Sequence, residues 1–178
     1  MLVFAGPNGS GKTTITRAWA PVGTYVNADD IRSATGCSDL EAAQAAEQIR
    51  EFCLADRLDF TFETVLSTDR NLRLLRAAQG AGYKITGVFV MTVSAELNVA
   101  RVMSRALAGG HDVPPDKTRT RYARSLANLP EFVRLCDEAN VFDNTDRPTI
   151  VFAKTAEGGV FFPTEWWPAP ALHELIGR

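Results

Sequence analysis

Cysteine and histidine are scarce in this sequence, and their scarcity excludes several classes of protein. The 178 residues include three cysteines, Cys37, Cys53 and Cys136, and two histidines, with no C-x-x-C pair and no zinc-ligand spacing. We therefore expect neither a disulfide framework nor a protein-bound transition metal, and the scattered free thiols point to a reducing compartment. The hydrolase motifs G-x-S-x-G and H-E-x-x-H are absent as well.

The sequence also lacks an excess of positive charge and any long apolar segment. The formal net charge is -2, which gives no support for a nucleic-acid-binding surface. No apolar stretch approaches the roughly 18 residues of a membrane span, and no basic region typical of a signal peptide precedes the first apolar run. These absences predict a cytoplasmic protein that binds neither nucleic acid nor a membrane.

What the sequence does contain is a phosphate-binding motif near its start. Residues 6–14 read GPNGSGKTT and match G-x-x-x-x-G-K-[ST]. The motif lies between an apolar run typical of a buried strand and a segment that can form a helix, a setting in which backbone N–H groups converge on phosphate oxygens. Lys12 would reach the β- and γ-phosphates, and the Thr13 hydroxyl would bind Mg²⁺; the alternative is a Gly-rich turn that binds nothing. The predicted nucleotide-binding residues are Gly6, Pro7, Asn8, Gly9, Ser10, Gly11, Lys12, Thr13 and Thr14.

Apolar runs alternate with helical patterns along the chain, and this alternation predicts an α/β fold with a parallel sheet and crossover helices. Together with the motif it indicates a P-loop NTPase or kinase fold, in which about five central parallel strands are flanked by helices on both faces. Internal repeats, low-complexity tracts and linkers are missing. We therefore expect one domain over residues 1–178, with a core at 1–145 and a C-terminal hairpin and tail at 146–178.

The longest predicted strand, at residues 85–93, has the continuous apolar character of a strand covered on both faces. The predicted strands are residues 2–5, 24–27, 60–65, 85–93 and 140–143. The predicted helices are residues 13–20, 39–58, 69–79, 95–108, 115–126 and 131–138. A terminal hairpin is expected to join residues 149–154 to 160–162, and the tail at 163–170 to pack on the sheet edge.

Carboxylates stand at the ends of two predicted strands, where open parallel sheets have their crevice. Asp29 and Asp30 follow the second strand and would lie beside the P-loop, where a general base or a residue near Mg²⁺ is needed. The alternative is that one of them caps the next short helix. Glu63 interrupts an apolar strand, where a carboxylate is costly to bury without a partner. It either meets substrate hydroxyls or Mg²⁺-bound water, or is an exposed strand-end acid.

Polar residues on predicted helices are further candidates. Glu47 lies within an apolar stripe, which leaves open whether it pairs with an arginine or faces a polar cleft. Arg101 and Arg105 stand one turn apart, Arg121 and Arg124 lie on the following helix, and a Gly-Gly pair separates the two helices. Arginines so placed suit a lid that neutralises charge on a transferring phosphoryl group; the alternative is two ordinary solvated helix faces.

In their order along the chain, these pieces resemble the zeta toxin family of P-loop kinases. The likeness covers about residues 2–145, and the ordered set is more specific than the P-loop alone. The segments that carry it are GPNGSGKTT (6–14), NADDI (27–31), FETVLS (62–67), GYKI (82–85), AELNVARV (95–102), GGHDVP (109–114) and RYARSLANL (121–129).

The resemblance implies a kinase that transfers the γ-phosphate of ATP to the 3′-hydroxyl of the amino sugar in UDP-N-acetylglucosamine, whose product blocks peptidoglycan precursor synthesis. It implies the following site residues: Lys12 and Thr13 for ATP·Mg²⁺, Asp29 as the base that takes the sugar hydroxyl proton, Glu47 and Glu63 as substrate-side carboxylates with Thr64 beside them, and Arg105 as a phosphate-binding arginine of the lid.

The sequence departs from the family pattern at three points. By spacing, the second lid arginine falls near His111, and Arg119 or Arg121 is the alternative. Val65 stands where a small hydroxyl residue is typical. The chain is also shorter than the well-studied toxins and carries no antitoxin segment, so we expect any antitoxin to be a separate chain.

Two other functions are compatible with the same residues. A P-loop kinase of another small hydroxyl compound, such as a nucleoside, sugar or antibiotic, would use Asp29 and Glu63 in the same way, because a base only needs to reach a hydroxyl. A nucleotide-dependent binding module would use the P-loop without transferring phosphate. Acceptor-dependent release of ADP would distinguish a kinase from such a module.

Overall fold

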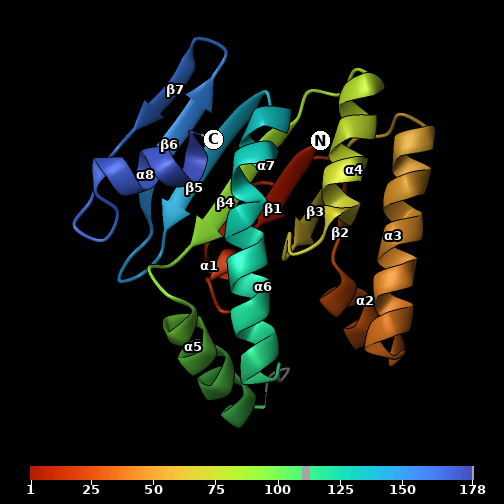
Figure 1. The fold of residues 1–178 in the computed structure, drawn as a ribbon. Coiled ribbons are helices and arrows are strands. Elements are labelled where there is room, and N and C mark those ends of the chain that lie inside the picture. The colour runs from red at the N-terminus through yellow and green to blue at the C-terminus, as the bar shows by residue number, and fades with distance from the viewer. Residues whose placement is uncertain (110–112, 178) are drawn as a thin grey trace.

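A seven-stranded sheet runs through the part of the chain that the computed structural model describes, residues 1–109 and 113–177. The strands lie side by side in the order β2-β3-β1-β4-β5-β6-β7 (Figure 1). The first five run parallel, and the last two continue the sheet in antiparallel pairing. Their bounds are β1 (Leu2–Ala5), β2 (Thr24–Val26), β3 (Phe60–Thr64), β4 (Thr86–Met91), β5 (Glu138–Asp143), β6 (Thr149–Thr155) and β7 (Gly158–Phe161).

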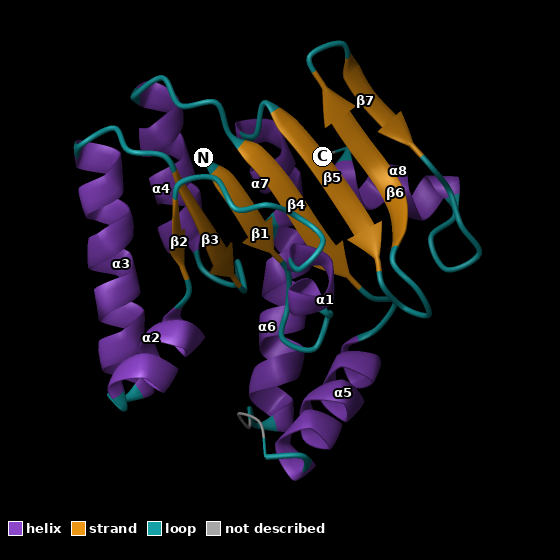
Figure 2. Cartoon of the chain, turned by 180° about the vertical axis from the view of Figure 1, so that it is seen from behind, coloured by secondary structure: helices purple, strands orange, loops and turns teal. Residues whose placement is uncertain are grey.

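The helices cover the two faces of the sheet unequally. Their bounds are α1 (Lys12–Thr16), α2 (Ala28–Thr35), α3 (Asp39–Ala55), α4 (Asp69–Gly80), α5 (Ala95–Leu107), α6 (Pro115–Ala127), α7 (Leu129–Leu135) and α8 (Ala169–Ile176). The main core lies under α3, α4, α7 and α8, whereas a small cluster that includes Ile15 and Trp19 covers the other face. Figure 2 shows that second face largely open to view. Among the described residues, no helix is long and apolar enough to cross a membrane.

The central strand β1 is apolar on both sides because both of its faces are buried. Leu2 and Phe4 point into the small cluster, and Val3 and Ala5 point into the main core, each at most 2% exposed. This explains why its sequence is a continuous apolar run rather than an alternating one. The predicted parallel strands and hairpin are confirmed, with shifts of a few residues at their ends.

Three predicted helices end three or four residues earlier than expected: the one at 39–58 ends at Ala55, and specific hydrogen bonds end the other two. The first helix ends at Thr16 rather than at residue 20, because Trp19 N–H bonds back to Thr16 in a tighter three-residue turn. The helix expected at 131–138 ends at Leu135, because Asp137 bonds instead to Ile85, the residue before β4. Its N–H donates to the Ile85 carbonyl oxygen (2.9 Å), and its carboxylate accepts from the Ile85 N–H (2.7 Å).

The C-terminal tail forms a helix that the sequence analysis did not predict. Helix α8 begins after Pro168, with Pro170 in its first turn, where a missing N–H costs nothing. Trp167 and Leu172 are buried in the main core, and α8 packs on α7. The tail therefore covers the face of the sheet near its end, rather than only an edge.

The parallel strands direct their carboxyl ends to one edge of the sheet, where α2, α5 and the start of α6 gather (Figure 1). Short polar caps fix how the chain enters these helices. Asn27 caps α2, Ser38 and Glu41 form a capping box at α3, and Ser94 caps α5. The candidate site lies at this edge.

Candidate active site

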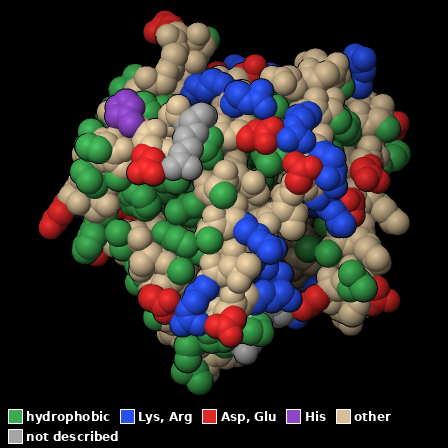
Figure 3. Space-filling view, in the orientation of Figure 1, with side chains coloured by type: hydrophobic (Ala, Val, Ile, Leu, Met, Phe, Trp, Pro, Cys, Tyr) green, Lys and Arg blue, Asp and Glu red, His purple; other side chains and the backbone are tan. Residues whose placement is uncertain are grey.

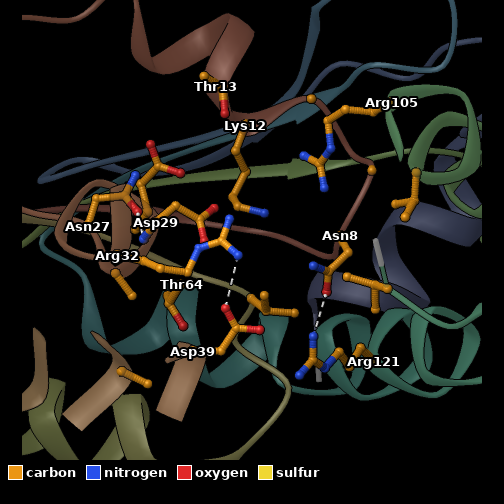
Figure 4. A pocket seen from close by; sticks show the side chains of 18 of the residues that line it. Asn8, Lys12, Thr13, Asn27, Asp29, Arg32, Asp39, Thr64, Arg105 and Arg121 are labelled. Atoms are coloured by element: carbon orange, nitrogen blue, oxygen red, sulfur yellow. Dashed lines mark hydrogen bonds and ion pairs between the residues drawn. The ribbon is translucent and has the colours of Figure 1, made fainter. Parts of the chain in front are cut away.

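A cavity of about 720 Å³ lies at the carboxyl ends of β1, β2 and β3. The P-loop forms its floor, α2 with the start of α3 forms one wall, and α5 with α6 forms the opposite wall (Figure 4). Figure 3 shows the surface hollowed there, with Lys and Arg side chains gathered over α6. Five cationic and three carboxylate side chains line the cavity, so its field favours anionic ligands. They are Lys12, Arg32, Arg101, Arg105, Arg121, Asp29, Asp39 and Glu63.

The P-loop has the backbone that close approach to phosphate requires. Gly9 (φ 79°) and Gly11 (φ 87°) adopt left-handed conformations that favour glycine. A Cβ atom on Gly9 would lie 2.5 Å from the Asn98 carbonyl oxygen, and one on Gly11 would lie 2.1 Å from Asn144 Nδ2, so any other residue would shift the loop. Of the predicted nucleotide-binding residues, Asn8, Gly9, Gly11, Lys12, Thr13 and Thr14 line the cavity, and Gly6, Pro7 and Ser10 are buried behind them.

Lys12 lies on the floor of the cavity, where burial and nearby charges act on it in opposite directions. Its ammonium group donates to the carbonyl oxygens of Gly6 (2.7 Å) and Pro7 (3.1 Å). Burial is the largest effect and lowers the pKa of Lys12 to about 8, whereas the carboxylates of Glu63 and Asp29 raise it. Both carboxylates therefore lie close enough to Lys12 to stabilise its charge, which brings the three side chains into one site.

Residues that follow β5 support the P-loop from behind. Asn144 Nδ2 donates to the Ser10 carbonyl oxygen (2.8 Å) in a buried bond. The guanidinium of Arg101 donates to the carbonyl oxygens of Asn144 (2.8 Å) and Thr145 (2.7 Å). Arg101 thus ties α5 to this support while it also lines the cavity. Sequence analysis missed Asn144, although a polar residue directly after a parallel strand is the same signal that marked Asp29.

Asp29 projects into the cavity from the first turn of α2, next to Lys12 (Figure 4). The cap of this helix is Asn27, whose Oδ1 accepts from the Asp29 N–H (2.9 Å). Neither Asp29 nor Asp30 is therefore needed as the cap, which was the alternative to a role in the site. Asp30 is exposed and does not line the cavity.

Glu63 stands near the end of β3, in register with Phe4 of the P-loop strand. Its Oε1 accepts a hydrogen bond from the hydroxyl of Tyr25 in β2. Burial, followed by this hydrogen bond, raises the pKa of Tyr25, so the phenol remains a donor. Glu63 is half-buried and partnered, and is not an exposed strand-end acid. Tyr25 was missed by the sequence analysis. Its only local signal is that it lies two residues before Asn27 and therefore on the same side of the extended chain.

Three of the predicted arginines line the cavity, Arg101 and Arg105 from α5 and Arg121 from α6. Arg105 lines it, and its positive charge lowers the pKa of the P-loop lysine. Arg121 lines it too and donates to the Asn8 side-chain oxygen of the P-loop (3.3 Å). Arg119 instead pairs with Glu96 (2.8 Å) and does not line the cavity. Of the two alternatives for the lid, the structure therefore brings Arg121 to the P-loop.

An ion pair that was not predicted joins the first wall of the cavity. Arg32 of α2 lies 3.2 Å from the carboxylate of Asp39, the first residue of α3 (Figure 4). Both side chains line the cavity. Sequence alone gave no signal for this contact, because each residue belongs to an ordinary polar stretch at a helix end.

Thr64 lines the cavity, but its hydroxyl also shapes the turn that follows β3. It accepts from the Leu66 N–H (2.9 Å) and from Asn71 Nδ2 (2.7 Å). Leu66 has φ 55°, a left-handed conformation that is rare for a bulky residue, and its side chain is buried. The Thr64 hydroxyl therefore holds a strained turn beside the site, and Val65 lines the cavity within that turn.

Two predicted substrate residues are not brought to this cavity by the described part of the structure. Glu47 pairs with Arg70 (2.8 Å) between α3 and α4 and lines a separate, smaller cavity. Glu47 therefore pairs with an arginine, one of the two alternatives raised by its apolar stripe, and it also faces a polar cavity, which was the other. His111 lies outside the described residues.

ATP and Mg²⁺ fit the residues present. The loop offers left-handed glycines, a half-buried lysine and two hydroxyl groups at the cavity, which suits the phosphates of a nucleotide. Within residues 1–109 and 113–177, no group of three or more His, Cys, Asp or Glu side chains could hold a metal ion. Mg²⁺ would therefore take most of its ligands from phosphates and water, with the Thr13 hydroxyl as protein ligand.

Comparison with known protein families tests the resemblance seen in the sequence. The model of the zeta toxin family matches residues 1–155. The chain belongs to the zeta toxin family. The resemblance seen in the sequence is therefore confirmed, and with it a kinase-like, nucleotide-binding fold. A protein of Haemophilus influenzae (strain Rd), described as uncharacterized, is 25% identical to this family member over 128 residues, which are 68% of this chain and 91% of that protein.

Solved structures share the fold of this zeta toxin family member. The PezAT toxin-antitoxin system of Streptococcus pneumoniae gives a TM-score of 0.62 at 17% identity, over 99% of this chain and 78% of that chain. The native AvrRxo1-ORF1:-ORF2 complex gives 0.72 at 16% identity, over 98% of this chain and 62% of that chain. The AvrRxo1-ORF1:-ORF2 structure with ATP gives 0.71 at 15% identity, over 90% and 59%. At these identities the likeness shows the fold alone, and the chain spans about three-fifths of the AvrRxo1 chains.

Proposed function

We propose that this zeta toxin family member is an ATP-dependent kinase that phosphorylates a hydroxyl group of UDP-N-acetylglucosamine or a related UDP-amino-sugar. The observation that carries the proposal is the single cavity in which Lys12 meets Asp29 and Glu63 on one side and Arg105 and Arg121 on the other. A phosphate cradle, a base and cations around the transferring group are what phosphoryl transfer requires. The ATP complex of a protein with the same fold supports ATP as the donor.

The reaction gives each side chain a distinct task. Asp29 accepts the proton of the acceptor hydroxyl while the hydroxyl oxygen forms a bond to the γ-phosphorus. The bond from the γ-phosphorus to the β–γ bridging oxygen breaks, and ADP leaves with that electron pair. Lys12 and Arg105 balance the negative charge on the transferring group and the leaving oxygen. Mg²⁺, bound with the nucleotide near Thr13, would supply further charge neutralisation there.

The surroundings of Glu63 suit a neutral sugar ring. Because Tyr25 donates to one carboxylate oxygen of Glu63, the carboxylate is held in one orientation and can accept a hydrogen bond from a sugar hydroxyl or amide. The excess of cations around the cavity suits an acceptor that carries phosphate groups. We infer that the reaction takes place in the cytoplasm, where both nucleotides are present. We also infer that a separate antitoxin chain is a partner, as the PezAT toxin-antitoxin system suggests by its fold.

A direct test is to incubate the purified protein with ATP, Mg²⁺ and a panel of UDP-sugars and to measure the gain of one phosphate mass by mass spectrometry. We expect a gain on UDP-N-acetylglucosamine or a close relative. Asp29→Asn should lower turnover by about 10²- to 10⁴-fold, because it removes the proton acceptor, and should leave ATP binding intact. Asp30→Asn is the matched control: it removes the same charge from the next residue, which does not line the cavity.

Three outcomes would contradict the proposal. Equal loss of turnover in the Asp29 and Asp30 variants would remove Asp29 from the base role. Phosphate gain on nucleosides or antibiotics, with none on UDP-sugars, would assign another acceptor. Tight ATP binding without turnover on any acceptor would indicate a nucleotide-dependent binding module.

A kinase of another small hydroxyl compound is the second candidate, and the position of Glu47 favours it. The resemblance gives Glu47 a contact with the sugar, but this carboxylate pairs with Arg70 in the neighbouring cavity. If that pair persists with acceptor bound, one contact expected for an amino sugar is missing. A Glu47→Gln variant with an unchanged KM for UDP-N-acetylglucosamine would show that the contact is not made.

A further inference from the structure

A second cavity, of about 330 Å³, lies between α3 and α4, outside the P-loop site. The two helices run side by side in both views of the ribbon (Figures 1 and 2). The volume falls at the lower end of the range for small-molecule pockets. Its charged lining consists of three arginines and two glutamates: Arg50, Arg70, Arg73, Glu47 and Glu51.

The three arginines differ in their partners. Arg70 pairs with Glu47 (2.8 Å), and Arg73 pairs with Asp69 (2.7 Å). Arg50 is only 9% exposed and forms neither a hydrogen bond nor an ion pair with any residue in the described ranges 1–109 and 113–177. Its guanidinium carbon instead lies 5.3 Å from the centre of the Phe62 ring, while the side chain lines the cavity.

An arginine in this position has unmet hydrogen-bonding capacity. A guanidinium carries five N–H donors and stays charged in proteins. No nitrogen of Arg50 is among the fully buried atoms without a partner, so these donors face the cavity and not an acceptor among the described residues. Burial is the largest effect on the pKa of Arg50 and lowers it, and the nearby charge of Arg70 lowers it further, against Glu47. Contact with the Phe62 ring gives an attraction but accepts no N–H hydrogen bond in the guanidinium plane. An anion in the cavity would provide the missing acceptors.

The second cavity adjoins the first along two elements. Ala43 lines the P-loop cavity and Glu47 lines the second one, and they are four residues apart on α3. That separation is one helical turn, or about 6 Å. On the other side Thr64, which lines the first cavity, accepts a hydrogen bond of 2.7 Å from Asn71, which lines the second. The two cavities are therefore neighbours along α3 and at the end of β3.

We propose that the cavity between α3 and α4 is a phosphate-binding subsite in which Arg50, assisted by Arg70, receives the diphosphate of the acceptor. The inference rests on the proposed function, which puts the reacting hydroxyl of the acceptor at Asp29. An arginine fork matches two phosphate oxygens at once. Arg70 can exchange Glu47 for phosphate at little cost, because exposed ion pairs contribute little. Glu47 would then be available to the sugar.

Calorimetric titration tests the subsite separately from phosphate transfer. The full chain is first saturated with a non-hydrolysable ATP analogue, so that the P-loop is occupied, and is then titrated with UDP and with pyrophosphate. We expect saturable binding of both, weakened tenfold or more in Arg50→Gln and several-fold in Arg70→Gln. Arg134→Gln is the charge-matched control, because Arg134 is exposed on α7 and lines neither cavity. Affinity for the ATP analogue should be the same in all four proteins.

The outcomes separate this inference from the proposed kinase activity. Equal binding of UDP to the wild type and to folded Arg50→Gln and Arg70→Gln, or no saturable binding at all, would overturn the subsite. If Arg50→Gln does not fold, Arg70→Gln and the charge-preserving Arg50→Lys decide the matter. Phosphorylation of UDP-sugars with an unchanged KM in Arg50→Gln would overturn the subsite and leave the kinase proposal standing. Arginine-dependent binding of pyrophosphate without phosphorylation of UDP-sugars would support the subsite and contradict the proposed acceptor.

Discussion

The ammonium group of Lys12 should make nucleotide binding depend on pH. With a pKa of about 8, the charged fraction falls from about nine-tenths at pH 7 to about one-tenth at pH 9. The charged form attracts phosphate and the neutral form does not, so nucleotide binding should weaken as pH rises through 8. The dissociation constant of a non-hydrolysable ATP analogue, measured from pH 6.5 to 9.5, should increase up to about tenfold per unit above pH 8.

A variant without the amine provides the comparison for this profile. Lys12→Gln should bind nucleotide more weakly at neutral pH and should show no change around pH 8. Lys12→Ala should abolish phosphate transfer while the fold survives, because the side chain contacts the loop and not the core. A flat binding profile in the wild type, or near-normal turnover of Lys12→Ala, would contradict the role of Lys12 in the P-loop.

Arg105 is expected to act on rate more than on affinity. It lines the cavity opposite Asp29 and near Lys12, where a cation can neutralise charge that develops during transfer. Arg105→Ala should lower kcat by about a hundredfold, with a much smaller effect on ATP affinity, because an interaction that strengthens in the transition state changes kcat. Arg119→Ala is the control from the neighbouring helix, since Arg119 pairs with Glu96 away from the cavity. Weaker binding with unchanged kcat would instead make Arg105 a ligand of ground-state nucleotide.

Among elements, the end of β5 has the closest link to the P-loop. Asn144 Nδ2 donates to the Ser10 carbonyl oxygen and fills the space that a side chain on Gly11 would need. Asn144→Ala should leave this carbonyl without a donor and cost about 1–3 kcal/mol, seen as a lower melting temperature and weaker nucleotide binding. Thr149→Ala, at the half-buried start of β6, should change neither. A variant of Asn144 with normal nucleotide affinity would show that the P-loop keeps its shape without this support.

Elements with a continuous apolar pattern were predictable, and those decided by single long-range bonds were not. Strand β1 was predicted with its observed bounds because both of its faces are buried. The boundary between α7 and β5 was misplaced. Two bonds between Asp137 and Ile85 end the helix, and no local sequence pattern predicts a contact over 52 positions. Helix α8 was missed because the prolines before it and in its first turn were interpreted as part of an irregular tail.

The residues of the candidate site can be divided in the same way, into those that a sequence pattern predicts and those that it does not. Lys12, Asp29 and Glu63 could be found from the rule that polar residues after parallel strands share one crevice, and the structure brings them together. Arg121 could be found only as one of two alternatives, because helix phase puts it and Arg119 on opposite faces but does not say which face meets the P-loop. Glu47 shows the limit of such reasoning: its carboxylate lies one turn beyond the cavity wall, and its partner Arg70 is 23 residues away in sequence. Its contact with substrate stays a prediction.

For the molecule as a whole, the C-terminal segment is expected to unfold together with the core. Strand β6 pairs with β5, and Leu172 of α8 is 0% exposed in the same core as Val3 and Phe89. Leu172→Ala should therefore destabilise the whole chain by about 2–5 kcal/mol, in one cooperative transition. Urea denaturation followed by circular dichroism and by loss of nucleotide binding should give coincident curves. Val160→Ala, at an exposed position of β7, should have little effect, and two separated transitions would show that residues 146–178 unfold independently.

The bond between Asn144 and Ser10 joins residues 134 positions apart, so its two partners are synthesised at different times. A ribosome that adds roughly 5–20 residues per second needs roughly 7–27 s to pass from one to the other. During that interval a nascent chain has a P-loop sequence but neither its support from β5 nor, for most of the time, Arg121 beside Asn8. The protein is therefore expected to be inert until β5 and Asn144 have been synthesised. The antitoxin chain proposed above would have this interval in which to bind before the first turnover.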